Sequence, residues 1–539
     1  MSGRAPRPTG LEWLLLGVGL VLTLHYAWIL DDAYVYFRYV DNFVDYGFGW
    51  VYNQGEFVEG YTSALWLVLL TALRELGIDY WWMVRGLGVL SFAGFWWGLV
   101  WLDRDLSPGR GEGPDRRRIV NLPLLFLAPN YATLTYFTSG VESPFVQLAA
   151  VAYALFLVRP SRPVAGAIVG LSPLVRPELA LAWILALGFA LYRTRRVPWW
   201  AVGVGVVVPG SWLVFRIYYY ADLVPNTFYL KHEEMIGQGF AYLHQSLASY
   251  GVYPLAVLAL VAVVALRRRA VSLDALPRIA MLVVAVAIAS YFVRIGGDPR
   301  HHRYLAFSFC LAAGSLAGLP EHVLRTFAPG LGGARLAALA VVVAFVFASL
   351  YPPQLSGHPI FRDITNVSVD LINDAEFHRK RPGLMPPPWS LDGLEDARPP
   401  ELLERRASWR SGYDDWGTSL WCVDNYWNID QGVIHGAGLT DAVLSRIPAE
   451  STRPAHKPAL RPRARVLADL RERDGQGVGK LRQAATRGDV PSWIGDNLET
   501  LELIERKIYN RHDFLENLGL ALTPVPEIVT RRARGQSGT

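Results

Sequence analysis

The sequence Leu30-Asp31-Asp32-Ala33-Tyr34-Val35-Tyr36-Phe37-Arg38-Tyr39 follows an apolar run of about 20 residues, and the rest of the chain is best understood from it. It places two adjacent carboxylates where a membrane-spanning helix would leave the hydrocarbon. If the chain is helical here, Asp31, Tyr34 and Arg38 share one face, because their spacing is i, i+3 and i+7. A helix cap with ordinary interfacial charge is the structural alternative. Ionisable residues at such a boundary are more often functional than structural, so we expect Asp31 and Asp32 to belong to a functional site.

The composition is that of a membrane protein with a polar portion. Of the 539 residues, 52% are apolar and only 18% are charged, whereas soluble domains carry about 25% charged residues. The net charge of +5 is modest, and the basic residues form short runs between apolar segments. Such runs indicate topology, so nucleic acid is not an expected partner. Two cysteines, Cys310 and Cys422, offer neither a disulfide framework nor a CxxC metal site.

Apolar segments predict a mainly α-helical, polytopic transmembrane bundle over residues 1–351. The segments lie at about 11–30, 63–78, 83–102, 119–137, 141–158, 163–175, 178–191, 197–219, 252–266, 279–293, 304–318 and 335–351. If the arginine-rich linkers are cytoplasmic, residues beyond 351 lie outside. Twelve crossings from a cytoplasmic N-terminus would instead return the C-terminus to the cytoplasm. We therefore expect the short segment 63–78 to lie at the outer interface, within one external loop over 31–82. About eleven spans remain, and 163–175 is the other segment that could fail to cross.

The two ends of the chain differ in character. Residues 352–539 are rich in Pro, Arg, Asp and Glu and contain no apolar run long enough to span a bilayer. This length suffices for an independent domain, and short apolar pieces between turns predict a soluble extracytoplasmic α/β or α+β domain. At the N-terminus no Ala-x-Ala site follows the run 11–30, so we interpret this run as a retained anchor and not as a signal peptide.

Further polar motifs fall in the expected external loops. In the sequence Glu59-Gly60-Tyr61-Thr62-Ser63, Thr62 or Ser63 would cap the next helix. Glu142 precedes Ser143-Pro144, where a carboxylate can also cap a helix start. Arg176 is followed by Pro177 and Glu178, and it can either reach lipid phosphates or pair with Glu178. Each motif therefore has a structural explanation beside a functional one.

Two of these loops carry cations. One reads Pro225-Asn226-Thr227-Phe228-Tyr229-Leu230-Lys231-His232, and the other reads Gly296-Gly297-Asp298-Pro299-Arg300-His301-His302-Arg303. Lys231 and Arg303 can face lipid headgroups, or they can neutralise a phosphate in a substrate. Adjacent histidines do not share a helix face, so His301 and His302 are not expected to bind a metal.

Taken in order, these motifs resemble those of the C-type (GT-C) membrane glycosyltransferases, which take sugars from polyprenyl-phosphate donors. The matching elements are Asp31-Asp32-Ala33-Tyr34, Glu59-x-Tyr61-Thr62-Ser63, Gly140-x-Glu142-Ser143-Pro144, Arg176-Pro177-Glu178, Asn226-Thr227-Phe228-Tyr229-x-Lys231, Gly296-Gly297-Asp298, Gly438-Leu439-Thr440-Asp441 and Arg453-Pro454-Ala455-His456. The chain is most similar to the arabinofuranosyltransferases that use decaprenyl-phosphoarabinose. The match covers about residues 10–310 and is thinner in the tail, and the sequence between Asp298 and Arg303 departs from the family pattern.

The resemblance implies inverting transfer of a sugar, here D-arabinofuranose, from a polyprenyl-phosphate donor to an extracytoplasmic glycan, glycolipid or glycoprotein. Asp31 and Asp32 would be the catalytic carboxylates, one of them a general base for the acceptor hydroxyl. Candidates for the donor phosphate are Lys231, Arg303, Arg38 and Arg176. Candidates for substrate binding are Tyr34, Glu59, Tyr61, Thr62, Glu142, Asn226, Tyr229, His232, Asp298, Asp441 and His456. The expected location is the plasma (inner) membrane, among membrane lipids, with the active site and the C-terminal domain on the periplasmic, extracytoplasmic side.

Several alternatives stay open. A mannosyl-, glucosyl- or aminoarabinosyltransferase acting on protein or lipid is the nearest, because the motifs do not identify the sugar. A lipid or polysaccharide transporter would also have many spans, but it would more often show inverted repeats, and the sequence has none. The motifs require no cofactor, although Asp31 and Asp32 could ligate a divalent cation. No GxGxxG element in a suitable context supports a nucleotide-sugar donor.

Overall fold

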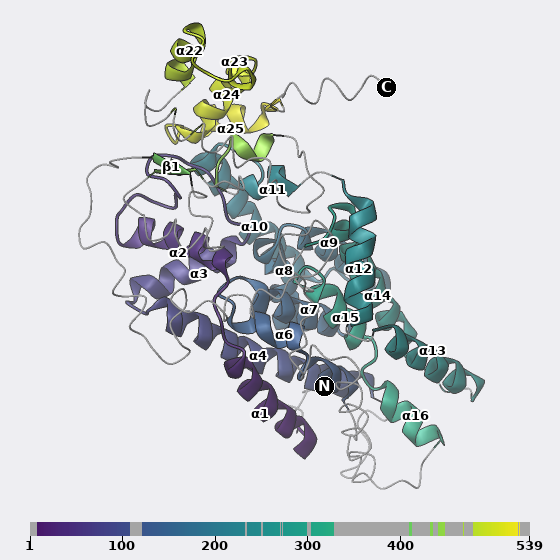
Figure 1. Ribbon diagram of the computed structural model, residues 1–539. Helices are drawn as coiled ribbons and strands as arrows, with labels where there is room; N and C mark the ends of the chain where they lie inside the picture. Colours follow the sequence, from purple (N-terminus) through teal and green to yellow (C-terminus); the bar gives the residue numbers. More distant parts are fainter. Residues whose placement is uncertain are drawn as a thin grey trace. The chain divides into compact units, whose positions relative to one another are not determined.

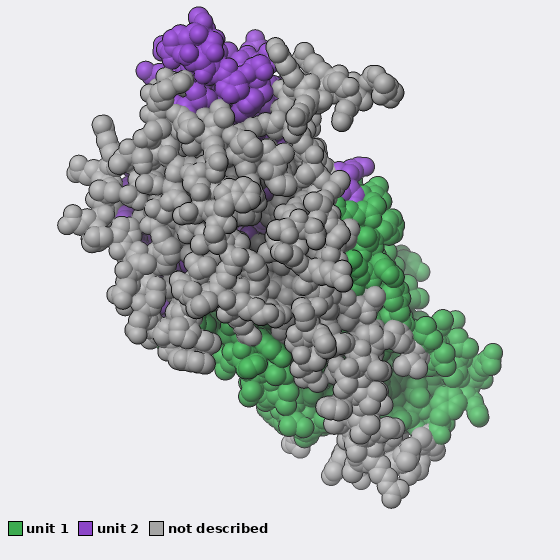
Figure 2. All heavy atoms as spheres, viewed as in Figure 1, with its two compact units in different colours: residues 1–29, 81–209, 236–381 green, residues 30–80, 210–235, 382–539 purple. Residues whose placement is uncertain are grey.

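The computed structural model describes most of the first 327 residues and parts of the C-terminal region. The described residues are 8–107, 121–231, 234–249, 252–269, 271, 273–298, 303–327, 409–411, 432–434, 440–447, 467, 470, 478–526 and 528. The chain divides into two compact units, coloured separately in Figure 2. The first comprises 1–29, 81–209 and 236–381, and the second comprises 30–80, 210–235 and 382–539. Each unit therefore joins segments that are far apart in the sequence, and the expected boundary at residue 351 stays a prediction.

The first unit is helical. Its helices are α1 (Gly10–His25), α4 (Tyr80–Leu106, apart from its first residue), α5 (Leu122–Leu127), α6 (Tyr131–Thr135), η1 (Tyr136–Thr138), α7 (Ser143–Val158), α8 (Pro163–Val175), α9 (Leu179–Thr194), the first half of α10 (Trp199–Tyr220), α12 (Ile236–Ser249), α13 (Val252–Arg268), α14 (Ala275–Arg294), α15 (Ala306–Gly314) and α16 (Leu319–Phe327). At its centre α15 packs against α7 and α14, and α9 and α12 also contact α14 (Figure 1). Glycines permit close approach: a Cβ at Gly239 would lie 1.8 Å from the carbonyl oxygen of Val293.

Four helical stretches of the described residues are long and apolar enough to cross a membrane. They are Tyr80–Leu106, Trp199–Tyr220, Ala275–Arg294 and Ala306–Phe327, the last combining α15 and α16. Large apolar side chains such as Trp199, Val207 and Val286 are exposed on these helices, as expected for surfaces that contact lipid. The predicted helical membrane protein is thereby confirmed, whereas the count of about eleven spans stays a prediction.

The second unit combines the first loop, the second half of α10 and the C-terminal segments. Its other elements are α2 (Asp31–Val44), α3 (Ala64–Glu75), α11 (Asn226–Lys231), β1 (Trp409–Ser411), β2 (Gly432–Ile434), η3 (Leu444–Arg446), α22 (Val478–Thr486), α23 (Ser492–Gly495), α24 (Leu498–Ile508) and α25 (Phe514–Leu522). β1 and β2 pair in parallel. Val58 of the first loop shares one apolar cluster with Leu444, Leu501 and Ile504. The C-terminal segments therefore share a core with the loop, and the expected α/β or α+β class of residues 352–539 stays a prediction.

Candidate functional site

The two adjacent acids lie in the first turn of α2. This helix begins at Asp31, and acidic residues in a first turn are favoured by the helix dipole. Asp32 is half-buried, whereas Tyr34 and Arg38 are buried; the Asp31 side chain lies outside what the structure describes. Arg38 Nε donates to the carbonyl oxygen of Tyr52 at 2.8 Å, and the guanidinium lies 4.7 Å from the centre of the Tyr52 ring. The condition for placing Asp31, Tyr34 and Arg38 on one face, a helical chain, is therefore met. Arg38 links this helix to the loop that follows.

Tyrosines of α2 hold the Glu59 loop against the helix. The hydroxyl of Tyr39 donates to the carbonyl of Val58 at 2.5 Å and accepts from the backbone N–H of Gly60 at 2.9 Å. The hydroxyl of Tyr36 accepts from the N–H of Ser63 at 3.0 Å. Ser63 also caps α3, since its side chain accepts from the N–H of Trp66, while Thr62 is half-buried. These bonds give the loop a fixed course beside the helix that carries the acids.

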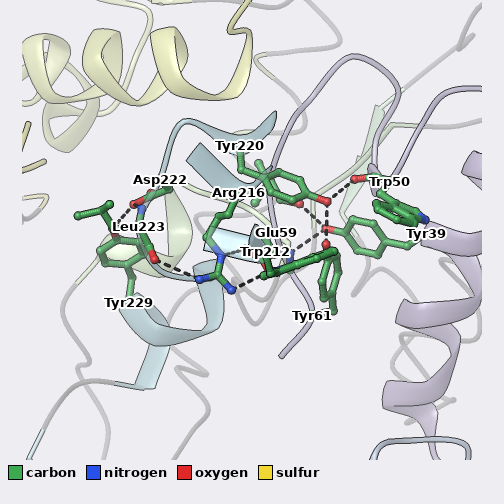
Figure 3. A network of polar contacts seen from close by, with 12 residues as sticks. Tyr39, Trp50, Glu59, Tyr61, Trp212, Arg216, Tyr220, Asp222, Leu223 and Tyr229 are labelled. Carbon is green, nitrogen blue, oxygen red and sulfur yellow. Dashed lines mark hydrogen bonds and ion pairs between the residues drawn. The ribbon is translucent and has the colours of Figure 1, made fainter. Parts of the chain in front are cut away.

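Glu59 is paired with an arginine that belongs to none of the sequence motifs. Arg216, on α10, uses Nε and Nη2 to contact both carboxylate oxygens of Glu59, with Nη2 at 3.1 Å from Oε1 (Figure 3). The indole N–H of Trp212 lies 3.4 Å from the same Oε1. Two parallel contacts of this kind are strong and geometrically specific. The signal in the sequence was a lone arginine within an apolar segment, which needs a partner.

Tyr61 follows Glu59 and enters a chain of hydroxyl groups. Its hydroxyl lies 2.9 Å from that of Tyr220, which in turn donates to the carbonyl of Trp50 at 2.8 Å (Figure 3). Burial raises the pKa of Tyr61 well above its ordinary value, and the negative charge of Glu59 adds to this effect. Tyr61 is therefore a neutral phenol at physiological pH, able to donate or accept a hydrogen bond but not to act as a base.

The short helix α11 connects this loop to the C-terminal segments within the second unit. The backbone N–H of Asn226 donates to the carbonyl of Glu59 at 2.9 Å. The Asn226 side chain donates to the carbonyl of Asp441 at 3.3 Å and accepts from the hydroxyl of Ser445 at 2.8 Å. The hydroxyl of Tyr229 donates to Asp222 at 2.7 Å. The structure thus brings together Glu59, Asn226 and Asp441, which are far apart in the sequence.

Besides Asp31, three of the candidates are not fully described. Lys231 ends α11, but its side chain lies outside the described residues, and so do His232 and His456. The roles expected of these residues stay predictions.

In the first unit, Arg176 and Glu142 form a buried ion pair. Nε and Nη2 of Arg176 lie 2.9 and 2.7 Å from Oε1 of Glu142, and Nη1 lies 3.5 Å from Glu178. Burial acts to raise the pKa of Glu142, but the positive charges of Arg176 and Arg303 outweigh it and hold this pKa below its ordinary value. The Arg176 guanidinium also lies 4.9 Å from the centre of the Tyr304 ring. Arg176 therefore pairs chiefly with Glu142 and more weakly with Glu178.

The loop before Arg303 is only partly described. Asp298 is buried and follows Gly297, whose φ of 76° lies in the left-handed region that favours glycine. His301 and His302 lie outside the described residues. Within the residues that are described, no three or more His, Cys, Asp or Glu side chains gather as a metal site would require.

The fold and these contacts define a helical membrane protein whose candidate residues are held by buried acid–arginine pairs. The chain is 32% identical over 340 residues to a terminal β-(1→2)-arabinofuranosyltransferase of Mycobacterium tuberculosis (strain ATCC 25618 / H37Rv), an alignment that covers 53% of this chain and 52% of the relative. It is 29% identical over 330 residues to a terminal β-(1→2)-arabinofuranosyltransferase of Corynebacterium glutamicum, covering 52% of this chain and 46% of the relative. The resemblance to arabinofuranosyltransferases is thereby confirmed.

The extent of these matches is limited. The chain spans about half the length of the curated relatives it matches. No protein-family model matches the chain. No solved structure matches it either.

Proposed function

We propose that the chain is an inverting membrane glycosyltransferase that transfers D-arabinofuranose from a polyprenyl-phosphate donor to an extracytoplasmic glycan or glycoconjugate. The similarity to two terminal arabinofuranosyltransferases carries this proposal. The adjacent carboxylates at the start of α2 support it, because inverting transfer needs one carboxylate base. The active site would face the extracytoplasmic side of the membrane.

The acids would act on the acceptor. One carboxylate of Asp31 and Asp32 takes the proton of the acceptor hydroxyl while its oxygen attacks the anomeric carbon. The bond between the anomeric carbon and the phosphate oxygen breaks, and its electron pair leaves with the polyprenyl phosphate. The other carboxylate orients the base or the acceptor.

The leaving phosphate would be stabilised by cations. Charge develops on the phosphate oxygen in the transition state, so a fixed cation near it lowers the barrier. Lys231 and Arg303 are the first candidates. Arg176 is neutralised by Glu142, and Arg38 donates to the backbone of Tyr52, so both have positioning contacts already.

A donor panel tests the proposal. Purified protein is incubated with polyprenyl-phosphate derivatives of arabinofuranose, mannose, glucose and aminoarabinose, with a glycan acceptor and with or without a chelator. We expect product only with the arabinofuranose donor. NMR of the product should show an anomeric configuration opposite to that of the donor. Transfer from another donor would replace the sugar assignment, and loss with the chelator would indicate a divalent cation. No transfer from any donor would contradict the enzyme assignment and favour a transporter.

A further inference from the structure

The second unit contains a pocket whose basic side chains no motif assigns to a ligand, although Glu59 and Asn226, two candidates for substrate binding, also line it. It is a small hollow that is partly open to solvent. Asp222, Arg446 and Lys507 form a polar wall, and Phe57, Ile504 and Ile508 form an apolar one. Charged side chains are seldom buried without a partner, so each charge of this wall should have a partner in the protein or in a ligand.

The cations of the wall outnumber its carboxylates. Oδ2 of Asp222 lies 3.2 Å from Nη2 of Arg446 and 3.7 Å from Nζ of Lys507. Glu59 also lines the pocket, but Arg216 already neutralises it. One positive charge of the described lining therefore lacks a counter-charge. The Arg446 and Lys507 side chains are only 6% and 5% exposed, so water compensates them poorly.

Hydrogen-bond donors are also left over. The ammonium of Lys507 carries three donors, and its contact with Asp222 at 3.7 Å is longer than an ordinary hydrogen bond. Nε of Arg446 is buried and finds no acceptor among the described residues. Nη1 of Arg446 donates to the carbonyl of Ala442 at 2.8 Å, and its guanidinium lies 3.9 Å from the centre of the Tyr229 ring, which fixes its plane.

The electrostatics of Lys507 agree with this geometry. Burial lowers the pKa of Lys507, the attraction of Asp222 acts against this, and the nearby charge of Arg446 lowers it further. An added negative charge would restore the balance, because it would meet both cations at once.

We propose that this pocket binds a small oxyanion, a phosphate group, on the donors that Lys507 and Arg446 do not direct to Asp222. A guanidinium held in a fixed plane and an ammonium are the donors that proteins use for phosphate oxygens. The phosphate can be free in solution or the head group of a lipid. The inference does not rest on glycosyl transfer, since it concerns binding alone.

Thermal unfolding of the full chain in detergent tests the site. Inorganic phosphate is titrated to the order of 10 mM without any sugar donor, at an ionic strength kept constant with gluconate. The test variant is Lys507→Met, which removes a buried charge and keeps a side chain of similar length. The control is Lys480→Met, at an exposed position of α22.

We expect phosphate to raise the apparent Tm of the wild type and of Lys480→Met, as for a ligand that binds only the folded state. Lys507→Met should show no rise. Broadening of the ³¹P signal of phosphate on adding protein provides a second readout that does not depend on unfolding. Arg446→Lys, which keeps the charge but loses the planar fork, should bind at least tenfold more weakly. An equal rise in Lys507→Met, or no rise and no broadening with the wild type, overturns the proposal.

A parallel titration with farnesyl phosphate identifies the source of the phosphate. If farnesyl phosphate stabilises the protein at a lower concentration than inorganic phosphate does, and Lys507→Met loses this effect, the ligand is a lipid headgroup. If inorganic phosphate acts at the lower concentration, the ligand is free phosphate. Stabilisation that Lys507→Met retains reflects partition into micelles and counts against the site. Failure of these titrations leaves the donor panel unaffected, so the two proposals fail separately.

Discussion

Arg216 and Glu59 are 157 residues apart in the sequence, yet two nitrogens of the guanidinium contact both oxygens of the carboxylate (Figure 3). Glu59 was expected to bind substrate. With Trp212 as a third donor, its oxygens are already engaged, and its backbone carbonyl accepts from Asn226. We therefore expect Glu59 to position the loop that carries Tyr61 and to leave direct contact with substrate to other groups.

The first prediction concerns this pair. Glu59→Gln and Arg216→Gln should each destabilise the protein by about 3–5 kcal/mol, because each leaves a buried charge unpaired. The double variant should lose much less than the sum, which thermal or denaturant unfolding of the purified protein measures. The exposed pair Arg482 and Glu502 is the control, and its Gln variants should change stability by less than about 1 kcal/mol. Additive losses at 59 and 216 would contradict a coupled pair.

The second prediction concerns pH and Glu142. Its pKa in the folded protein lies below its ordinary value of about 4.3. The stabilisation from its ionised form is therefore full above that ordinary pKa and is lost as the pH falls through the folded pKa. We expect Glu142→Gln to lower the apparent Tm at pH 7, with a difference from wild type that shrinks below about pH 4.3. A difference that stays constant down to pH 3 would mean that the charge of Glu142 is not responsible.

The third prediction concerns the base. Asp31→Asn and Asp32→Asn should leave expression intact, and at least one should lower turnover about 100-fold or more. Initial rates with a saturating arabinofuranose donor measure this. Wild-type rates in both variants would remove the catalytic role from α2.

The fourth prediction concerns the donor phosphate. Lys231→Ala and Arg303→Ala should each lower the rate with every donor sugar alike, since the phosphate is common to all donors. A substitution of Arg38 is the comparison. A residue that only orients a carboxylate or keeps it ionised should, when replaced, mainly shift the pH profile of the rate. Normal rates and donor affinity in both alanine variants would move attention to Arg176.

The fifth prediction concerns topology. In a variant lacking Cys310 and Cys422, single cysteines at 75, 235 and 480 should react with a membrane-impermeant thiol reagent in intact cells. Cysteines at 110 and 267–270 should not react, because the positive-inside rule places their arginine-rich linkers in the cytoplasm. Protection at 75 together with reaction at 110 would show that 63–78 crosses the membrane.

The local features of this protein could be predicted from its sequence. The apolar segment expected at 279–293 is the core of α14, and that expected at 141–158 coincides closely with α7. A helix over Asp31 and Asp32 was only a condition for their sharing a face with Arg38, and the structure meets it. Hydropathy and helix spacing act over a few turns, and short motifs preserve a family's chemistry, so they indicated a helical membrane protein similar to arabinofuranosyltransferases.

The pairing of polar and charged side chains was decided by tertiary structure alone. The sequence offers many arginines, and spacing along the chain does not reveal that Glu59 meets Arg216, that Asn226 meets Ser445, or that Asp222 lies between Arg446 and Lys507. A buried charge needs a counter-charge within a few ångströms, and only the packed chain determines which distant side chain arrives there. Sequence therefore supplied the residue types of the candidate site, and packing selected their partners.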